Sequence, residues 1–332
     1  IMLSLSEAQV KELRKKHYGV VGRHSAVQIC NWTKKSILGR GTCYKEKFYG
    51  AHAHKCAQFS PVVLWCNMNC IYCWRPMEWM KYREIGEDEV DDPDTIIRGV
   101  IEERRKLLIG FLGNPKADRR KVLDALEPDH YAISLSGEPT LYPRLDEMVR
   151  LLRDKYRART IFIVTNGQVP EMLRKLDRTG SLPTQLYLSI RGSNPELERF
   201  ISRPVLKDYW ERMMESLEVV AGLEGRTRRV IRMTMIKGIN MDPRYIDEYA
   251  RMIEAANPDF IEVKAYMHLG LSTQRLSKEN MPTHEEIMAY ARRLAERLEG
   301  FELVDEQRES RIALLMNRDS PVPLKIYPEE SS

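Results

Sequence analysis

Short apolar runs alternate with longer amphipathic segments along most of the chain, from about residue 61 to residue 298. The short runs are rich in β-branched side chains and apolar at successive positions, as strands are when both faces of a parallel sheet are covered. They predict strands at residues 61–65, 131–135, 160–164, 185–190, 229–236 and 260–265. The segments between them predict helices near residues 93–112, 143–157, 170–178, 205–222, 243–256 and 284–298. Six βα units are two short of a closed eight-stranded barrel, so the pattern predicts an α/β fold with a partial (β/α)6, TIM-like barrel.

The two ends of the chain follow other patterns. Residues 3–17 have the spacing of a short amphipathic helix, for which Ser6 is the expected N-cap. Residues 18–60 show no clean helical or strand period, which is consistent with a segment organised by bound metal. Apolar runs at 301–304 and 312–316 predict a hairpin at a sheet edge, and the residues after it are expected to be frayed. We therefore expect one structural domain in three parts: an N-terminal extension (1–60), the barrel (61–300) and a C-terminal hairpin and tail (301–332).

The composition, with 43% hydrophobic and 30% charged residues, is that of a soluble globular protein. No apolar run reaches the roughly 18–20 residues that a membrane-spanning helix needs, and the charged N-terminus does not have the pattern of a signal peptide. These features predict a cytoplasmic protein with no membrane partner. The net charge of +5 and the pI of about 8.8 are compatible with an anionic partner, but such a charge is equally ordinary in enzymes that bind no nucleic acid.

All six cysteines lie between residues 30 and 73, which indicates a shared purpose rather than scattered core packing. Cys66, Cys70 and Cys73, here called the first triad, have the spacing C-x3-C-x2-C and directly follow the first expected strand. Loops after barrel strands open onto the face where active sites form. Three thiolates can hold three irons of a [4Fe–4S] cluster and leave the fourth iron open. A zinc site completed by His52 or His54 is the alternative.

The first triad and a second element together resemble the radical S-adenosylmethionine (SAM) superfamily. The aromatic Tyr72 precedes the last cysteine, as in the Cx3CxΦC motif of that superfamily, and Ser136-Gly137-Glu138-Pro139 is similar to its GGEP element. The resemblance implies that the open iron binds SAM and that one electron cleaves SAM to a 5′-deoxyadenosyl radical. It also implies a set of cofactor-binding residues, namely Tyr72, Gly137, Glu138, Pro139, Asn166 and Ser189. The last two are explained equally well as turn and packing residues.

A second group of cysteines precedes the first. Cys30, Cys43 and Cys56, here called the second triad, are separated by twelve residues each, too far apart for a local metal knuckle. A folded loop could bring the three together around a second [4Fe–4S] cluster. The alternative is three reduced cysteines without metal, which the lack of an apolar pattern around them disfavours.

The two triads, with the stretch from Trp65 to Pro76, closely resemble the 4-demethylwyosine synthases, radical SAM enzymes that modify tRNA in wybutosine biosynthesis. The resemblance covers nearly the whole chain, and because these 332 residues are too few to include the flavodoxin-like domain of eukaryotic members, we expect the archaeal form. It implies two [4Fe–4S] clusters, an external electron donor such as flavodoxin or ferredoxin, and a Schiff base between pyruvate and Lys45, with Lys47 as the reserve candidate. The implied reaction condenses pyruvate with the 1-methylguanosine next to the anticodon, in the anticodon stem-loop of phenylalanine tRNA.

Two other functions remain open on these residues. One is a different two-cluster radical SAM reaction, such as sulfur insertion or activation of a glycyl-radical enzyme. The other is a zinc-stabilised RNA-binding protein without catalysis.

RNA binding has its own candidate residues, because base chemistry needs an extruded nucleotide and neutralised phosphates. The candidate basic patches are Lys34–Lys35, Arg119–Arg120–Lys121 and Arg226/Arg228/Arg229, and the candidate stacking residues are Trp32, Trp74 and Trp79. Solvated helix faces explain the charges equally well, and core packing explains the tryptophans.

Overall fold

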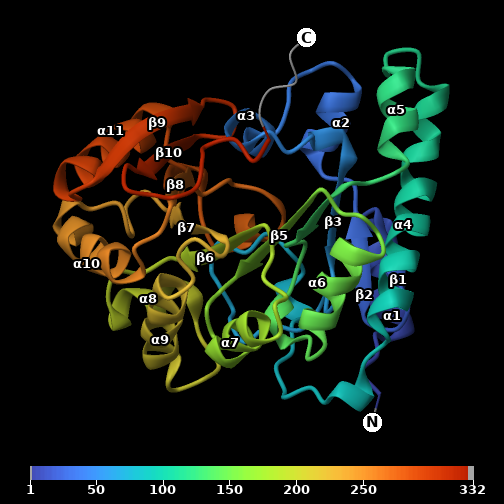
Figure 1. Ribbon diagram of the computed structural model, residues 1–332, viewed down its shortest axis with the longest axis horizontal. Helices are drawn as coiled ribbons and strands as arrows, with labels where there is room; N and C mark the ends of the chain where they lie inside the picture. Colours follow the sequence, from blue (N-terminus) through green and yellow to red (C-terminus); the bar gives the residue numbers. More distant parts are fainter. Residues whose placement is uncertain (1, 328–332) are drawn as a thin grey trace.

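Six parallel strands form the centre of the protein in a computed structural model that describes residues 2–327 (Figure 1). In sheet order they are β3 (Cys56–Ser60), β4 (His130–Ile133), β5 (Thr160–Thr165), β6 (Gln185–Ile190), β7 (Arg228–Met235) and β8 (Phe260–Ala265). The helices that follow them are α4 (Pro93–Ile109), α6 (Leu145–Asp154), α7 (Pro170–Arg178), α9 (Tyr209–Ala221), α10 (Ile246–Ala256) and α11 (His284–Arg297). The predicted partial (β/α)6 barrel is confirmed.

The first barrel strand lies earlier in the chain than the sequence predicts. The predicted strand at 61–65 is wrong: these residues are buried but turn, with the Val63 amide donating to the carbonyl oxygen of His24. The strand is β3, in which half-buried Cys56 and Gln58 alternate with the buried Ala57 and Phe59. Because polar residues occupy alternate positions of β3, it lacks the continuous apolar run that marks the other barrel strands.

The N-terminal segment has more regular structure than its sequence pattern predicts. The helix α1 (Glu7–Lys15) begins after Ser6, whose side chain accepts from the Gln9 amide, so the predicted N-cap is confirmed. Residues 18–60 contain regular elements although their sequence shows no clean helical or strand period. This segment contains β1 (Tyr18–Val21), β2 (Ser25–Gln28), α2 (Asn31–Ile37) and α3 (Tyr44–Tyr49), and β1 and β2 extend the sheet beyond β3. Two short helices farther along, α5 (Arg119–Ala125) and α8 (Pro195–Ser202), were also not predicted.

The predicted C-terminal hairpin is confirmed. Strands β9 (Phe301–Gln307) and β10 (Ile312–Asn317) pair antiparallel, and β10 adds to β8 to complete a ten-stranded sheet. The last residues predicted to fray include 328–332, which, like residue 1, lie outside the described residues.

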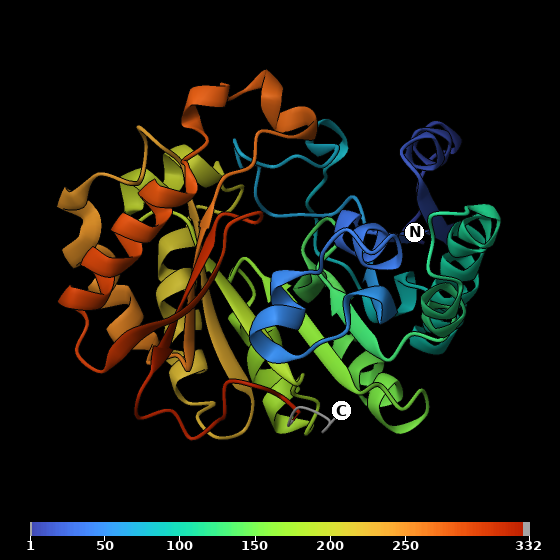
Figure 2. The ribbon, with the colours of Figure 1, turned by 90° about the horizontal axis from the view of Figure 1, so that it is seen from above.

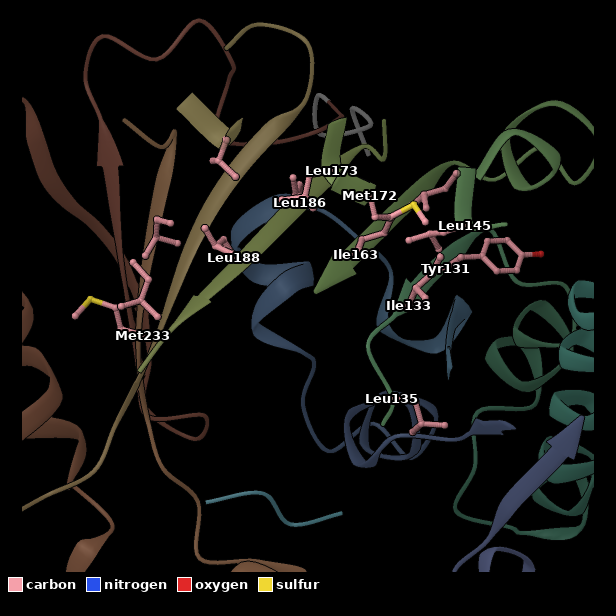
Figure 3. Packing of buried hydrophobic residues seen from close by; sticks show 14 of the residues in the cluster. Tyr131, Ile133, Leu135, Leu145, Ile163, Met172, Leu173, Leu186, Leu188 and Met233 are labelled. Atoms are coloured by element: carbon pink, nitrogen blue, oxygen red, sulfur yellow. The ribbon is translucent and has the colours of Figure 1, made fainter. Parts of the chain in front are cut away.

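The two faces of the curved sheet have different cores. On the outer face, strand residues such as Ile163 and Leu188 pack with helix residues such as Leu145 and Leu173 (Figure 3). On the inner face, four strand residues and three residues of α3 form a separate aromatic cluster: Phe162, Tyr187, Val230 and Phe260 with Tyr44, Phe48 and Tyr49. The helix α3 therefore lies inside the curve of the sheet (Figure 2), where it brings Cys43 and Lys45 to the barrel interior.

Within residues 2–327, no helix has the length and apolar character needed to cross a membrane.

Candidate active site

Alternate residues of the barrel strands point into the barrel, and several of these are only half-buried. They include Gln58 on β3, Val164 on β5, Ser189 on β6, Arg232 and Thr234 on β7, and Lys264 on β8. The register places Ser189 beside Arg232 and Thr234 beside Lys264. Neighbours in a parallel register share a face, so the interior is a polar space above the aromatic cluster rather than a filled core.

The first triad lies on a loop that is bonded to α8. The Asn69 amide donates to the carbonyl oxygen of Ser202 at 2.9 Å, and the Ile71 amide donates to that of Ile201 at 2.9 Å. These bonds use carbonyl groups at the C-terminal end of α8, which have no partner within the helix, and so anchor the residues between the cysteines. Burial raises the pKa of the Cys70 thiol to about 11. The raised pKa means that ionising the buried thiol costs free energy. A metal cluster would offset this cost, because it stabilises the thiolate that it binds.

Gly137 is required for a close approach between two segments. Its φ of +71° lies in the left-handed region, and a Cβ atom there would be 2.2 Å from the Val62 carbonyl oxygen and 2.6 Å from that of Trp65. The Glu138 amide also donates to the Trp65 carbonyl oxygen, at 2.8 Å. The Ser136–Pro139 element thus packs on the backbone that leads into the first triad. Pro139 is buried and begins a short 3-10 turn after this contact.

Glu138 is buried and joins the ends of two strands. Its Oε1 accepts from the hydroxyls of Thr140 and Thr165, at 2.6 and 2.7 Å, and its Oε2 accepts from the Asn166 amide at 2.8 Å. Burial raises the pKa of this carboxyl group, and the four hydrogen bonds oppose the shift. The Asn166 side chain in turn lies 3.8 Å from the Cys66 sulfur. The structure therefore brings Glu138 and Asn166 to the first triad, and their contacts with SAM stay a prediction.

Unpartnered polar atoms around the first triad fit a bound cofactor. The Asn67 Nδ2 and the Ser136 Oγ are buried without a hydrogen-bond partner in the described chain. An unpaired buried polar group costs about 1–3 kcal/mol, so both atoms mark a place for a polar ligand. Tyr72 is half-buried beside Cys70, where burial and the neighbouring thiolate raise the pKa of its hydroxyl. These residues fit the cluster and SAM that the sequence predicts.

The second triad is assembled from three separate elements. Cys30 caps α2, Cys43 precedes the first turn of α3, and Cys56 begins β3. The three sulfurs are near enough for their charges to interact: burial and then Cys30 raise the pKa of Cys43 to about 12, and Cys30 and Cys43 add to the effect of burial in raising the pKa of Cys56. In residues 2–327, no three His, Cys, Asp or Glu side chains are grouped as ligands of a metal ion. In an iron–sulfur cluster each thiolate binds a different iron. The three cysteines can therefore hold a cluster without being grouped around a single metal ion.

Arg75 connects the two triads electrostatically. Its guanidinium is buried, and Nη1 donates to the Tyr18 hydroxyl at 2.5 Å and to Gln28 Oε1 at 2.9 Å. Burial lowers its pKa, while the charges of Tyr18, Cys73 and Cys30 raise it. One buried cation therefore acts on a cysteine of each triad.

The structure separates the two lysine candidates. Lys45 Nζ lies 5.1 Å from the ring centre of Phe162 and 5.0 Å from that of Tyr187, inside the barrel. Burial, and then the charge of Arg232, lowers the pKa of Lys45. Lys47 is exposed and forms an ion pair with Asp305 at 2.8 Å. Of these two lysines, Lys45 is the one placed to meet a small molecule in the barrel.

His130 adds an unpartnered ring nitrogen to the barrel interior near Lys45. Its Nε2 is buried without a hydrogen-bond partner among the described residues. Burial, with a smaller contribution from the charge of Lys45, lowers the pKa of His130 to about 3. The ring is therefore neutral and available to a ligand.

Sequence reasoning missed Arg232, Glu262 and Lys264 inside the barrel. The available signal was a polar or charged residue at every second position of two otherwise apolar strands, I-R-M-T on β7 and I-E-V-K on β8. In an exposed strand this alternation is ordinary, but in a central strand it indicates a polar lumen.

The candidate RNA-binding residues have mixed outcomes. Arg228 and Arg229 are buried, and Arg229 pairs with Asp259 at 3.0 Å, so the third basic patch is wrong as a surface. The other two patches lie on the adjoining helices α2 and α5. Trp74 is 45% exposed, while Trp79 packs against the main core.

Comparison with known proteins agrees with this geometry. The family model for the radical SAM superfamily matches residues 60–253, and the model for wyosine base formation matches residues 255–317. A tRNA 4-demethylwyosine synthase of Pyrococcus abyssi is 46% identical over 316 residues, 95% of this chain and 90% of its own. The protein of the same name from Methanocaldococcus jannaschii is 37% identical over 326 residues, 97% of this chain and 100% of its own.

Two solved structures are also similar. A structure of TYW1 with a lysine–pyruvate adduct bound has a TM-score of 0.83 at 36% identity, covering 97% of this chain and 98% of that one. The crystal structure of archaeal TYW1 has a TM-score of 0.77 at 32% identity, covering 97% and 100%.

The partial barrel and the first triad define a radical SAM enzyme. More specifically, the chain belongs to the S-adenosyl-L-methionine-dependent tRNA 4-demethylwyosine synthases, enzymes that act on tRNA. The family interpretation of the sequence is confirmed, and the alternative of a non-catalytic zinc-stabilised RNA-binding protein is wrong. Membership implies SAM and an iron–sulfur cluster as cofactors.

Proposed function

We propose that this enzyme condenses pyruvate with the 1-methylguanosine next to the anticodon of phenylalanine tRNA to form 4-demethylwyosine. The observation that supports this most strongly is the position of Lys45, an amine inside the barrel near the second triad and away from bulk solvent. A similar TYW1 structure contains a lysine–pyruvate adduct. A barrel lysine is the group that such an adduct requires.

Lys45 acts as the nucleophile toward pyruvate. Its nitrogen attacks carbon 2 of the keto acid, a C=N bond forms, and the keto oxygen leaves as water. Burial keeps this amine less basic than a solvated lysine, and the Phe162 and Tyr187 rings limit its positions. Lys47, held outside by Asp305, takes no part in this step.

The two triads have different roles in the proposal. Cys66, Cys70 and Cys73 would hold the cluster that supplies the electron for SAM cleavage, and Cys30, Cys43 and Cys56 would hold a second cluster with an iron open to pyruvate. Around the first triad, Glu138 fixes Asn166 near Cys66, and the unpartnered Asn67 and Ser136 atoms contact the cofactor. Ser189, half-buried in the barrel, faces the same space.

The partners follow from this chemistry. The target base enters at the carboxyl end of the barrel strands, beside the exposed Trp74 and the cation of Arg75 that lies 3.5 Å from its ring. The helices α2 and α5, with Lys34–Lys35 and Arg119–Lys121, are the basic surface proposed for tRNA phosphates. The electron comes from a separate carrier such as flavodoxin or ferredoxin, and the cytoplasm stays the predicted compartment.

Product analysis tests the proposal. The reconstituted enzyme is incubated without oxygen with SAM, a reductant, pyruvate and phenylalanine tRNA that contains 1-methylguanosine. We expect 5′-deoxyadenosine and the tricyclic base, with carbons 2 and 3 of labelled pyruvate in the base. Formation of 5′-deoxyadenosine with a different modified base would exclude the pyruvate assignment and leave the family assignment intact.

A further inference from the structure

The barrel interior around Lys45 contains more positive than negative side chains. Three cations, Lys45, Arg232 and Lys264, surround one carboxylate, Glu262. Burying uncompensated charge is costly, so the surplus calls for an anionic occupant.

Arg232 is held rigidly beside Lys45. Its Nε and Nη2 donate to Glu262 Oε2 at 3.0 and 2.8 Å, and Nη2 also donates to the Tyr44 hydroxyl. The Tyr49 hydroxyl donates to the other oxygen of Glu262 at 3.0 Å. These contacts fix the guanidinium on the inner face of β7, next to Ser189 in the register.

Lys264 adds a cation with no carboxylate of its own. Its Nζ donates to the Ser310 carbonyl oxygen at 2.8 Å, and in residues 2–327 no acidic side chain pairs with it. The register places it beside Thr234 and one layer above Arg232. Two of its three N–H groups are therefore free for a ligand.

Two aromatic rings connect the three cations. Tyr187 is shared by Lys45 Nζ at 5.0 Å and the Arg232 guanidinium at 4.6 Å from its ring centre. Tyr44 is shared by Arg232 at 5.8 Å and by Lys264 Nζ at 5.6 Å. Arg232 thus lies between the two lysines in this arrangement.

We propose that Arg232 and Lys264 bind the carboxylate of the 2-oxo acid that Lys45 captures, and so select 2-oxo acids over neutral ketones. In pyruvate the carboxylate is bonded directly to the carbon that Lys45 attacks, so an anion site must lie beside this lysine. Charge-assisted hydrogen bonds from a fixed guanidinium and an ammonium are the usual means of holding a carboxylate. This inference rests on the proposed function, because it assumes that Lys45 forms the Schiff base.

A second account of the same cations is charge balance for the second triad, since Cys43 lies within electrostatic range of both Lys45 and Lys264. The two roles predict different effects of removing the cations. A counter-ion affects iron binding whatever the ketone is, whereas a carboxylate site affects only ketones that have a carboxylate.

Reductive trapping separates the accounts. The reconstituted enzyme is treated anaerobically with cyanoborohydride and either pyruvate or hydroxyacetone, a neutral ketone of similar size, and labelling of Lys45 is followed by peptide mass mapping. For Arg232→Gln and Lys264→Gln we expect pyruvate labelling to slow about tenfold or more, with hydroxyacetone labelling and iron content nearly unchanged. Arg232→Lys should retain part of the preference for pyruvate.

Arg228→Gln is the matched control. Arg228 lies on the same face of β7, but it donates to Gln185 Oε1 at 2.8 Å and to the Leu324 carbonyl oxygen at 2.9 Å, deeper in the barrel. We expect its substitution to leave the preference for pyruvate unchanged.

The outcomes are distinct. Equal slowing of both ketones, or loss of iron from the variants, overturns the carboxylate site and leaves the proposed function standing. If wild-type Lys45 is labelled by neither ketone, both proposals fail.

Discussion

The two cysteine triads are built in opposite ways. The first is a single loop, and its backbone is held by α8 and by the Trp65 contact with Glu138. The second draws one cysteine each from α2, α3 and β3, and it depends on the aromatic residues of α3 filling the inner face of the sheet.

This difference corresponds to what each triad determines: the first determines the class of enzyme, and the second determines the particular reaction. A local loop with a fixed spacing is transferable between proteins, and here it defines a radical SAM enzyme. A site assembled from distant elements exists only in this arrangement of the chain, and it brings Lys45 and Lys264 within range of Cys43. We therefore expect damage to the first triad to stop all radical chemistry, and damage to the second to stop only the final condensation.

The largest effect is expected for Cys66→Ala. Loss of one thiolate from the first triad removes the cluster that activates SAM, so 5′-deoxyadenosine formation should fall to background. About half of the bound iron should also be lost, because the second triad does not share ligands with the first. Iron analysis and nucleoside chromatography of the anaerobic protein measure both quantities. Loss of all iron would show that the two triads are not independent.

Gly137→Ala should damage the first triad without touching a cysteine. The added Cβ meets two backbone carbonyl oxygens at a positive φ, neither of which can move away alone. We expect the free energy of unfolding to fall by about 3 kcal/mol, with preferential loss of the first cluster. Gly110→Ala, where nothing lies within 4 Å of the new atom, is the control for denaturant unfolding. Equal effects of the two substitutions would contradict the close approach.

Arg75→Gln tests a feature that the two triads share. Removing a buried positive charge disfavours the added electron on either cluster, so both reduction potentials should fall, by about 30–60 mV. Arg75→Lys, which keeps the charge, should show a smaller change. Redox titration followed by electron paramagnetic resonance measures the two clusters separately. A shift in only one cluster would place Arg75 in that triad alone.

The smallest effect is expected for His24, which holds the turn at residues 61–65 that leads into the loop of the first triad. His24 Nδ1 donates to the Pro61 carbonyl oxygen at 2.6 Å, and Nε2 accepts from the Asp91 amide at 2.8 Å, so the folded ring is neutral. Burial lowers the pKa of His24 below 6.5.

Below about pH 6.5 the unfolded chain therefore gains a proton that the folded chain does not, and stability falls with decreasing pH. His24→Gln should reduce this slope by at most about 1.4 kcal/mol per pH unit, as measured by urea unfolding between pH 5 and 7.5. His17→Gln, at an exposed position, is the control. An unchanged slope in the His24 variant would contradict the neutral buried ring.

The sequence predicts the features that depend on neighbouring residues and not those assembled from distant parts of the chain. The five later barrel strands, the hairpin and the first triad depend on contiguous patterns, and all were found at or near their positions. The first strand was missed because Cys56 and Gln58 face the barrel interior and interrupt the apolar run. The grouping of Arg232, Glu262 and Lys264 depends on strand register and on α3, neither of which a linear pattern contains.

The central claim, that the two triads perform separate steps, is tested most directly in Cys43→Ala. The variant is incubated anaerobically with SAM, reductant, pyruvate and tRNA containing 1-methylguanosine, and 5′-deoxyadenosine and the tricyclic base are measured in the same reaction. We predict that 5′-deoxyadenosine still forms while the tricyclic base is absent. Loss of both products, or formation of both, would contradict the account.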